Sequence, residues 1–120
     1  MPEITADMSR KISSILLALR KARIATALEI REAAREGRTQ DRNRLILEMK
    51  ELDRQFAKAG QMEIDFLASN LSVSKSERRL AEAAEESRAL TRRLDGVTRV
   101  LKAVEGLTKV LKALAKAVTP

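Results

Sequence analysis

The sequence predicts an all-α protein built from long amphipathic helices. Three observations support this fold class: both prolines are terminal, at Pro2 and Pro120, only four residues are glycine, and apolar residues recur at spacings of three and four. Proline removes a backbone donor and breaks a helix from within, so its confinement to the ends leaves the interior free to be helical. The length of 120 residues suits one domain, spanning 1–120.

The first predicted helix spans residues 5–36. Its apolar face consists of Ile4, Met8, Ile12, Ile15, Leu19, Ala22, Thr26, Ile30 and Ala33. Gly37 can adopt the left-handed conformation that ends a helix, and Thr39 can cap the next helix, with Asp41 in its first turn. Because this turn is short, we expect the first two helices to be antiparallel neighbours.

The second predicted helix spans residues 40–71 and has Gly60 on its apolar face. The face consists of Leu45, Met49, Leu52, Phe56, Ile64, Leu67 and Leu71. Its phase shifts at Gly60, which predicts a stutter where another helix approaches closely. The alternative is a frayed or kinked helix, because glycine disfavours helix. The Ser and Asn residues in 70–74 predict the second turn.

The third predicted helix spans residues 75–118 as one element, because its apolar rhythm passes through Asp95-Gly96 without a change of phase. It would be about 66 Å long, against about 50 Å for each of the first two helices, so its last turns would extend beyond them. The alternative is a break near Asp95-Gly96, which gives a four-helix bundle without an overhang.

Residues 97–118 combine a wide apolar arc with a narrow basic stripe. If the helix overhangs, we expect the arc to pack against a second copy or another helical protein. The predicted interface residues are Val97, Val100, Leu101, Val104, Leu107, Leu111, Leu114 and Val118. A second possibility is that two neighbouring helices of the same chain bury the arc, with the lysines keeping the exposed side in water.

The basic stripe offers a third possibility, which is binding to an anionic membrane surface. The side chains that could make this contact are Arg99, Lys102, Lys109, Lys112 and Lys116. Nucleic acid is a weaker candidate, although the net charge is +7. Acidic residues are interleaved with the basic clusters, so we expect only non-specific, salt-sensitive phosphate contacts.

The chain lacks Cys, His, Trp and Tyr. It therefore has no side chain that ordinarily titrates near neutrality, no thiolate nucleophile, and neither thiolate nor imidazole metal ligands. We identify no phosphate-binding loop or nucleophile motif either. The sequence predicts a protein that is not an enzyme, with no catalytic residue, cofactor or metal site.

We expect a cytoplasmic protein, because no apolar run reaches the roughly 18 residues of a membrane span. Glu3 and Asp7 stand where a signal peptide would carry positive charge, which argues against a signal peptide. The function we expect is helical interaction or assembly, by self-association or by docking a partner helix on the apolar face of the C-terminal helix.

Overall fold

The structure is a computed structural model that describes residues 6–59 and 73–118. Within these ranges the chain forms four α-helices and no strand, which confirms the all-α class. The helices are α1 (Ala6–Arg35), α2 (Thr39–Ala59), α4 (Val73–Leu90) and α5 (Val97–Val118). Helix α1 matches the predicted 5–36 closely. The part of the predicted second helix beyond Ala59, with the Gly60 stutter and most of the 70–74 turn, lies outside the described residues.

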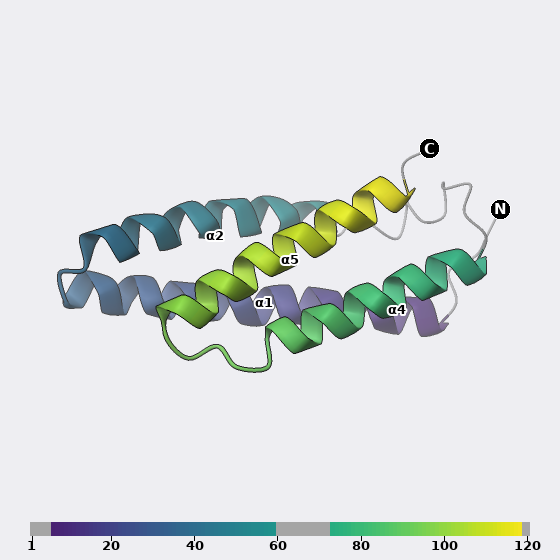
Figure 1. The fold of residues 1–120 in the computed structure, drawn as a ribbon, viewed down its shortest axis with the longest axis horizontal. Coiled ribbons are helices and arrows are strands. Elements are labelled where there is room, and N and C mark those ends of the chain that lie inside the picture. The colour runs from purple at the N-terminus through teal and green to yellow at the C-terminus, as the bar shows by residue number, and fades with distance from the viewer. Residues whose placement is uncertain (1–5, 60–72, 119–120) are drawn as a thin grey trace.

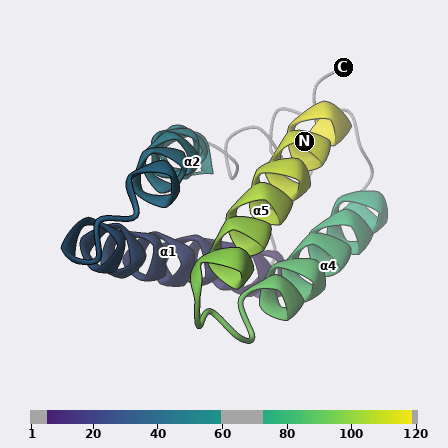
Figure 2. The ribbon, with the colours of Figure 1, turned by 60° about the vertical axis from the view of Figure 1, so that its left-hand side comes forward.

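The helices form two antiparallel hairpins, α1 with α2 and α4 with α5. The α1–α2 turn lies at one end of the molecule, and the α4–α5 turn faces the same way but is set back from that end (Figure 1). Helix α1 packs against α2 and α4. Helix α5 packs against the same two helices and also contacts α1 (Figure 2). The result is an elongated bundle with extents of 53 × 23 × 16 Å.

The core runs along the bundle and is filled by aliphatic side chains from all four helices. Its largest fully buried members are Ile12, Ile15, Leu19, Leu45, Leu52, Leu80, Leu107, Val100 and Val104. Thr26 is also fully buried, and its hydroxyl donates a hydrogen bond to the carbonyl of Ala22 at 2.6 Å. This bond avoids the cost of an unpaired buried polar group.

The turn between α1 and α2 forms as predicted at Gly37, which has a φ of 71°. The amide of Arg38 donates to the carbonyl of Ala33 at 2.9 Å, and the amide of Gly37 donates to Ala34 at 3.3 Å. These are the two bonds of a Schellman motif. The predicted cap, Thr39, is the first residue within α2.

The N-cap of α2 is instead Arg38, whose carbonyl accepts the first helical bond from Arg42 at 3.0 Å. The guanidinium of Arg38 reaches Glu36 on one side of the turn and Asp41 on the other, each at 2.8 Å. A bridging cation therefore holds this turn, where we had expected a capping hydroxyl.

The continuous helix over 75–118 is wrong, and the alternative break near Asp95-Gly96 is correct. Helix α4 ends at Leu90 and α5 begins at Val97. Between them Gly96 has a φ of 87°, a conformation that other residues adopt only with strain. Its carbonyl accepts the first bond of α5, from Val100 at 3.1 Å.

The spacing of apolar residues gave the wrong prediction because it reflects which side chains are buried. It does not show whether the backbone amides between them form helical hydrogen bonds. Leu90, Leu94 and Val97 all pack against the core, although the chain leaves the helix between them. A connecting segment that buries one leucine thus preserves the spacing of a helix. Because the chain reverses there, α5 folds back along α2 and α4, and no part of it overhangs as predicted.

Glycine also permits a close helix approach, at Gly106 on α5. A Cβ atom at this position would lie 2.7 Å from both methyl carbons of Leu90 on α4. The missing side chain is therefore what lets Leu90 seat against α5, at the end of the hairpin next to its turn.

Candidate functional site

The predicted interface residues lie inside this chain. Val100, Leu101, Val104, Leu107, Leu111 and Leu114 belong to the core and are at most 6% exposed. Val97 is partly buried against the same core, and the side chain of Val118 lies outside the described residues. The structure thus brings these residues together as an internal surface, which a partner could reach only if α5 left the bundle.

The predicted basic stripe does lie on the exposed side of α5. Arg99, Lys102, Lys109 and Lys112 are exposed, and the side chain of Lys116 lies outside the described residues. Arg99 donates to Asp95 at 2.7 Å. This bond and a backbone hydrogen bond hold the pKa of Asp95 below its ordinary value. A second ion pair, at 3.0 Å, joins Arg44 of α2 to Glu105, within the stripe.

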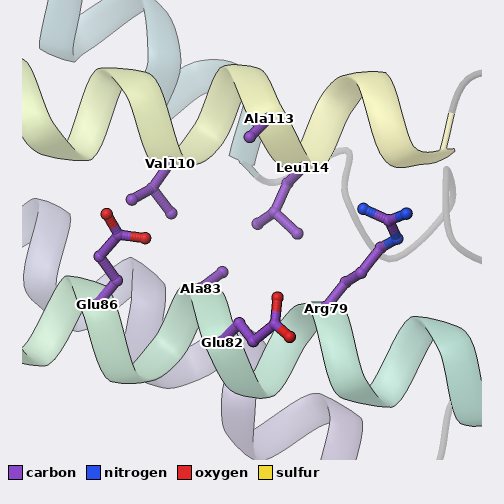
Figure 3. Close-up of a pocket in the computed structure, with 7 residues that line it drawn as sticks. All are labelled: Arg79, Glu82, Ala83, Glu86, Val110, Ala113 and Leu114. Atoms are coloured by element: carbon purple, nitrogen blue, oxygen red, sulfur yellow. The ribbon is translucent and has the colours of Figure 1, made fainter.

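A shallow groove lies between α4 and α5 (Figure 3). Arg79, Glu82 and Glu86 extend from α4, and Val110 and Leu114 from α5. Its volume is about 100 Å³, whereas sites for small molecules start at roughly 300 Å³. The groove is therefore too small to hold a substrate or cofactor.

A larger depression of about 320 Å³ lies nearer the α4–α5 turn. Its lining includes the cations Arg93, Arg99 and Lys102, two of which belong to the predicted basic stripe. Glu86 also lines it, and Arg99 is already engaged by Asp95. Most of this positive charge is therefore balanced within the chain.

The most unusual surface feature lies on α1, where the sequence analysis assigned no site. Leu17, Ile24 and Leu28 are 50%, 58% and 58% exposed. At about 100° per residue the three side chains fall within an arc of about 40°, on the side of α1 opposite the core residues. We call this set the α1 row. On α2, Leu47 is 66% exposed, but it stands alone.

Cations flank the α1 row on both sides. By helical position Arg20 and Arg31 lie along its side nearer α2, and Lys21 lies along the other side. All three are exposed, and among the described residues none of them forms an ion pair. Arg23, one step nearer α2, is by contrast tied to Asp53 at 2.7 Å. The row is thus an apolar ridge bordered by uncompensated positive charge.

One carboxyl group at the contact of α2 with α5 has a perturbed pKa. Burial of Glu48 raises its pKa above the ordinary value, and repulsion from Glu105 and Glu51 adds to the rise, while Arg44 opposes it. The group is partly buried beside the core and lines neither of the two depressions described above. We therefore assign it a role in stability.

Metal and membrane signatures are absent from the described part of the chain. It contains no cluster of three or more acidic side chains suited to a cation. Each helix there is too short or too polar to cross a bilayer.

Comparison with protein-family models, with curated proteins and with solved structures gives no match to this chain. A proposal about its function therefore rests on the surface of the molecule itself.

The α1 row was not predicted from the sequence, because the prediction considered only one apolar stripe on each helix. The signal was present in the spacing of Leu17, Ile24 and Leu28, which are seven and four residues apart. This spacing forms a second stripe, out of phase with the stripe through Ile15 and Leu19. Large apolar residues left over after the core stripe has been traced would have identified it.

Proposed function

We propose that this chain is a non-enzymatic interaction protein that docks a partner helix along the α1 row. The observation behind the proposal is that Leu17, Ile24 and Leu28 form one apolar ridge, each at least 50% exposed, on the side of α1 away from the core. Single exposed leucines are ordinary on protein surfaces. Three in register on one rigid helix supply the anchor positions of a helix–helix contact.

The spacing of the row supports a helix as the partner. Residues seven and four apart are the positions that insert into the holes of a facing helix in a coiled-coil contact. From Leu17 to Leu28 the row is about 16 Å long, or three turns. An arc of about 40° suits such a seam but is narrow for a helix lying in a membrane surface, whose apolar stripe normally exceeds about 100°.

The expected interaction surface on α5 is not retained in this proposal. Its apolar residues fill the core beside α2 and α4, so exposing them would cost the burial energy that holds the bundle together. The basic stripe of α5 lacks an apolar side of its own once that face is covered. The expectation of an interaction protein is kept, and the docking face is assigned to α1.

Site-specific photocrosslinking in the producing cells tests the proposal. A benzophenone-bearing residue is placed at Ile24 in the row, and at Leu47 on α2 as a control that is at least as exposed. We expect a discrete adduct from position 24 and none of the same mass from position 47. The double substitution Leu17→Asp and Leu28→Asp should abolish the adduct while circular dichroism shows an unchanged fold.

The identified adduct is then purified and titrated against the wild-type chain and the double variant. Binding that needs Leu17 and Leu28, with the crosslink on a helix of the partner, supports the proposal. No adduct at position 24, the same adduct at position 47, or an adduct that survives the double substitution would overturn it.

A further inference from the structure

We infer that the helix docking on the α1 row carries acidic side chains on both flanks of its apolar seam, and that it belongs to a different protein. This inference rests on the proposed function and specifies the partner. Its basis is the uncompensated charge around the row, where exposed Arg20 and Arg31 border one side and exposed Lys21 the other.

Acidic residues on α1 do not offset these cations. The two whose side chains the structure describes, Glu29 and Glu32, are partly buried, and Glu32 pairs with Arg35 at 3.4 Å. The nearest cation toward α2, Arg23, is already paired with Asp53. Glu32 lies beside Leu28 but is already paired with Arg35, so within the described part of α1 the face around the row carries a net positive charge.

A second copy of this chain is a poor partner for such a face. In an antiparallel pairing of two α1 rows, Leu17 would meet Leu28 of the other copy, but Lys21 would lie against Ile24. Arg20 would lie opposite Ala25 and Arg31 opposite Ser14, so neither would meet an acidic side chain. Like charges brought together at an interface cost free energy and slow association. The row is thus complementary to a helix with glutamate or aspartate at its flanking positions.

Lys21 adds a register signal to this charge pattern. By helical position it borders the row, and it also falls four residues after Leu17 and three before Ile24, so it limits the width of the apolar surface at that step. A lysine at one such position weakens an apolar seam and selects the alignment in which the partner presents an acid. We therefore expect the flanking position of the partner that faces Lys21 to be Glu or Asp.

Two designed helices of the same length test the inference against the full chain. Both carry leucine at the seam, and they differ only at the flanking positions, which are Glu in one helix and Lys in the other. Fluorescence anisotropy should show the Glu helix binding at least about tenfold more tightly at about 0.1 M salt, with the advantage shrinking toward about 1 M. The triple variant Arg20→Glu, Lys21→Glu and Arg31→Glu should reverse the preference, and Ile24→Asp should abolish binding of both helices.

The outcomes separate this inference from the proposed function. Equal binding of the two helices, or tighter binding of the Lys helix, overturns the acidic partner and leaves helix docking intact. If neither designed helix binds but the crosslink at position 24 is obtained, the acidic partner is again overturned and helix docking is left intact. If there is no helix binding and no crosslink, both proposals fail.

Two further measurements address the other occupants of the row. Flotation with phosphatidylserine vesicles that is lost on Leu17→Asp would assign the row to a membrane and overturn the inference.

In light scattering we expect the wild type to remain a monomer of 13.4 kDa. A dimer that Ile24→Asp dissociates would assign the row to a second copy. The variant Lys21→Leu, which removes a flanking charge and widens the apolar row, should by contrast raise the mass.

Discussion

Two apolar stripes of this molecule are built from the same residue types and lie in opposite environments. On α5, Val100, Leu107 and Leu114 are at most 4% exposed. On α1, Leu17, Ile24 and Leu28 are at least 50% exposed. Both stripes are aliphatic and both are bordered by cations, so composition does not distinguish them. The chain folds α5 onto two neighbours, whereas α1 has already buried its core side.

The comparison separates residues needed for folding from residues available for function. Helix α1 buries Ile12, Ile15 and Leu19 in the core, and this side is sufficient to attach it to α2 and α4. The second stripe of α1 leaves at least half of the surface of each side chain in water. Exposed apolar area is a liability for solubility, which is the reason for proposing a partner at this ridge.

The largest expected difference in stability is between variants that truncate one residue in each stripe. Leu107→Ala should lower the free energy of unfolding by about 3 kcal/mol, because it removes fully buried methyl groups and leaves a cavity. Ile24→Ala should change it by no more than about 0.5 kcal/mol, because the side chain is already in water. Urea unfolding followed by circular dichroism measures both variants. Similar losses would show that the two stripes do not differ in burial.

The turn that folds α5 inward provides the second test. Gly96→Ala forces a side chain into a left-handed conformation and should cost about 1–2 kcal/mol. Gly96→Asn should cost less, because asparagine tolerates that conformation better than alanine does. Gly37→Ala is the matched control, since Gly37 has a similar φ, at the other turn.

The same variant tests whether α5 can be released. Strain at Gly96 favours the continuous helix that the sequence had predicted, so Gly96→Ala should populate a domain-swapped dimer at high concentration, detectable by light scattering. Unchanged stability in Gly96→Ala would contradict the importance of this turn in burying the α5 stripe.

Much of the fold could be predicted from the sequence because burial and helix periodicity coincide in α1. The stripe through Ile12 and Leu19, the helix end at Gly37 and the antiparallel neighbour all followed from local rules. The break at Gly96 could not, because the partly buried Leu94 kept the apolar spacing intact across a segment that is not helical. Periodicity identifies a buried face, but it does not say whether the backbone is continuous beneath it.

The candidate site was less accessible to sequence reasoning. The wide apolar arc of α5 looked like a surplus surface only because α5 was placed at the end of a 44-residue helix, counted from 75 to 118. Once the chain reverses, α2 and α4 cover that arc. The α1 row could be recognised in the sequence as large apolar residues outside the core stripe. Its exposure, however, depends on which helices pack around α1, and spacing within one helix does not specify that.

The smallest expected effect is a pH dependence of stability, which we attribute to Glu48 at the contact of α2 with α5. Burial, followed by the charge of Glu105, raises the pKa of Glu48 above its ordinary 4.5. The folded chain therefore binds this proton more tightly than the unfolded chain, and its contribution to stability falls as the pH rises above about 4.5. Glu48→Gln removes the titration, so its melting temperature relative to wild type should be higher at about pH 7 than at about pH 4. In a Glu105→Gln background the gain should be smaller, because one source of the repulsion is gone. If the difference in melting temperature between Glu48→Gln and wild type stayed constant with pH, Glu48 would not lie in a less solvated, acidic environment. The contact of α2 with α5 would then be as open to water at this position as the α1 row is.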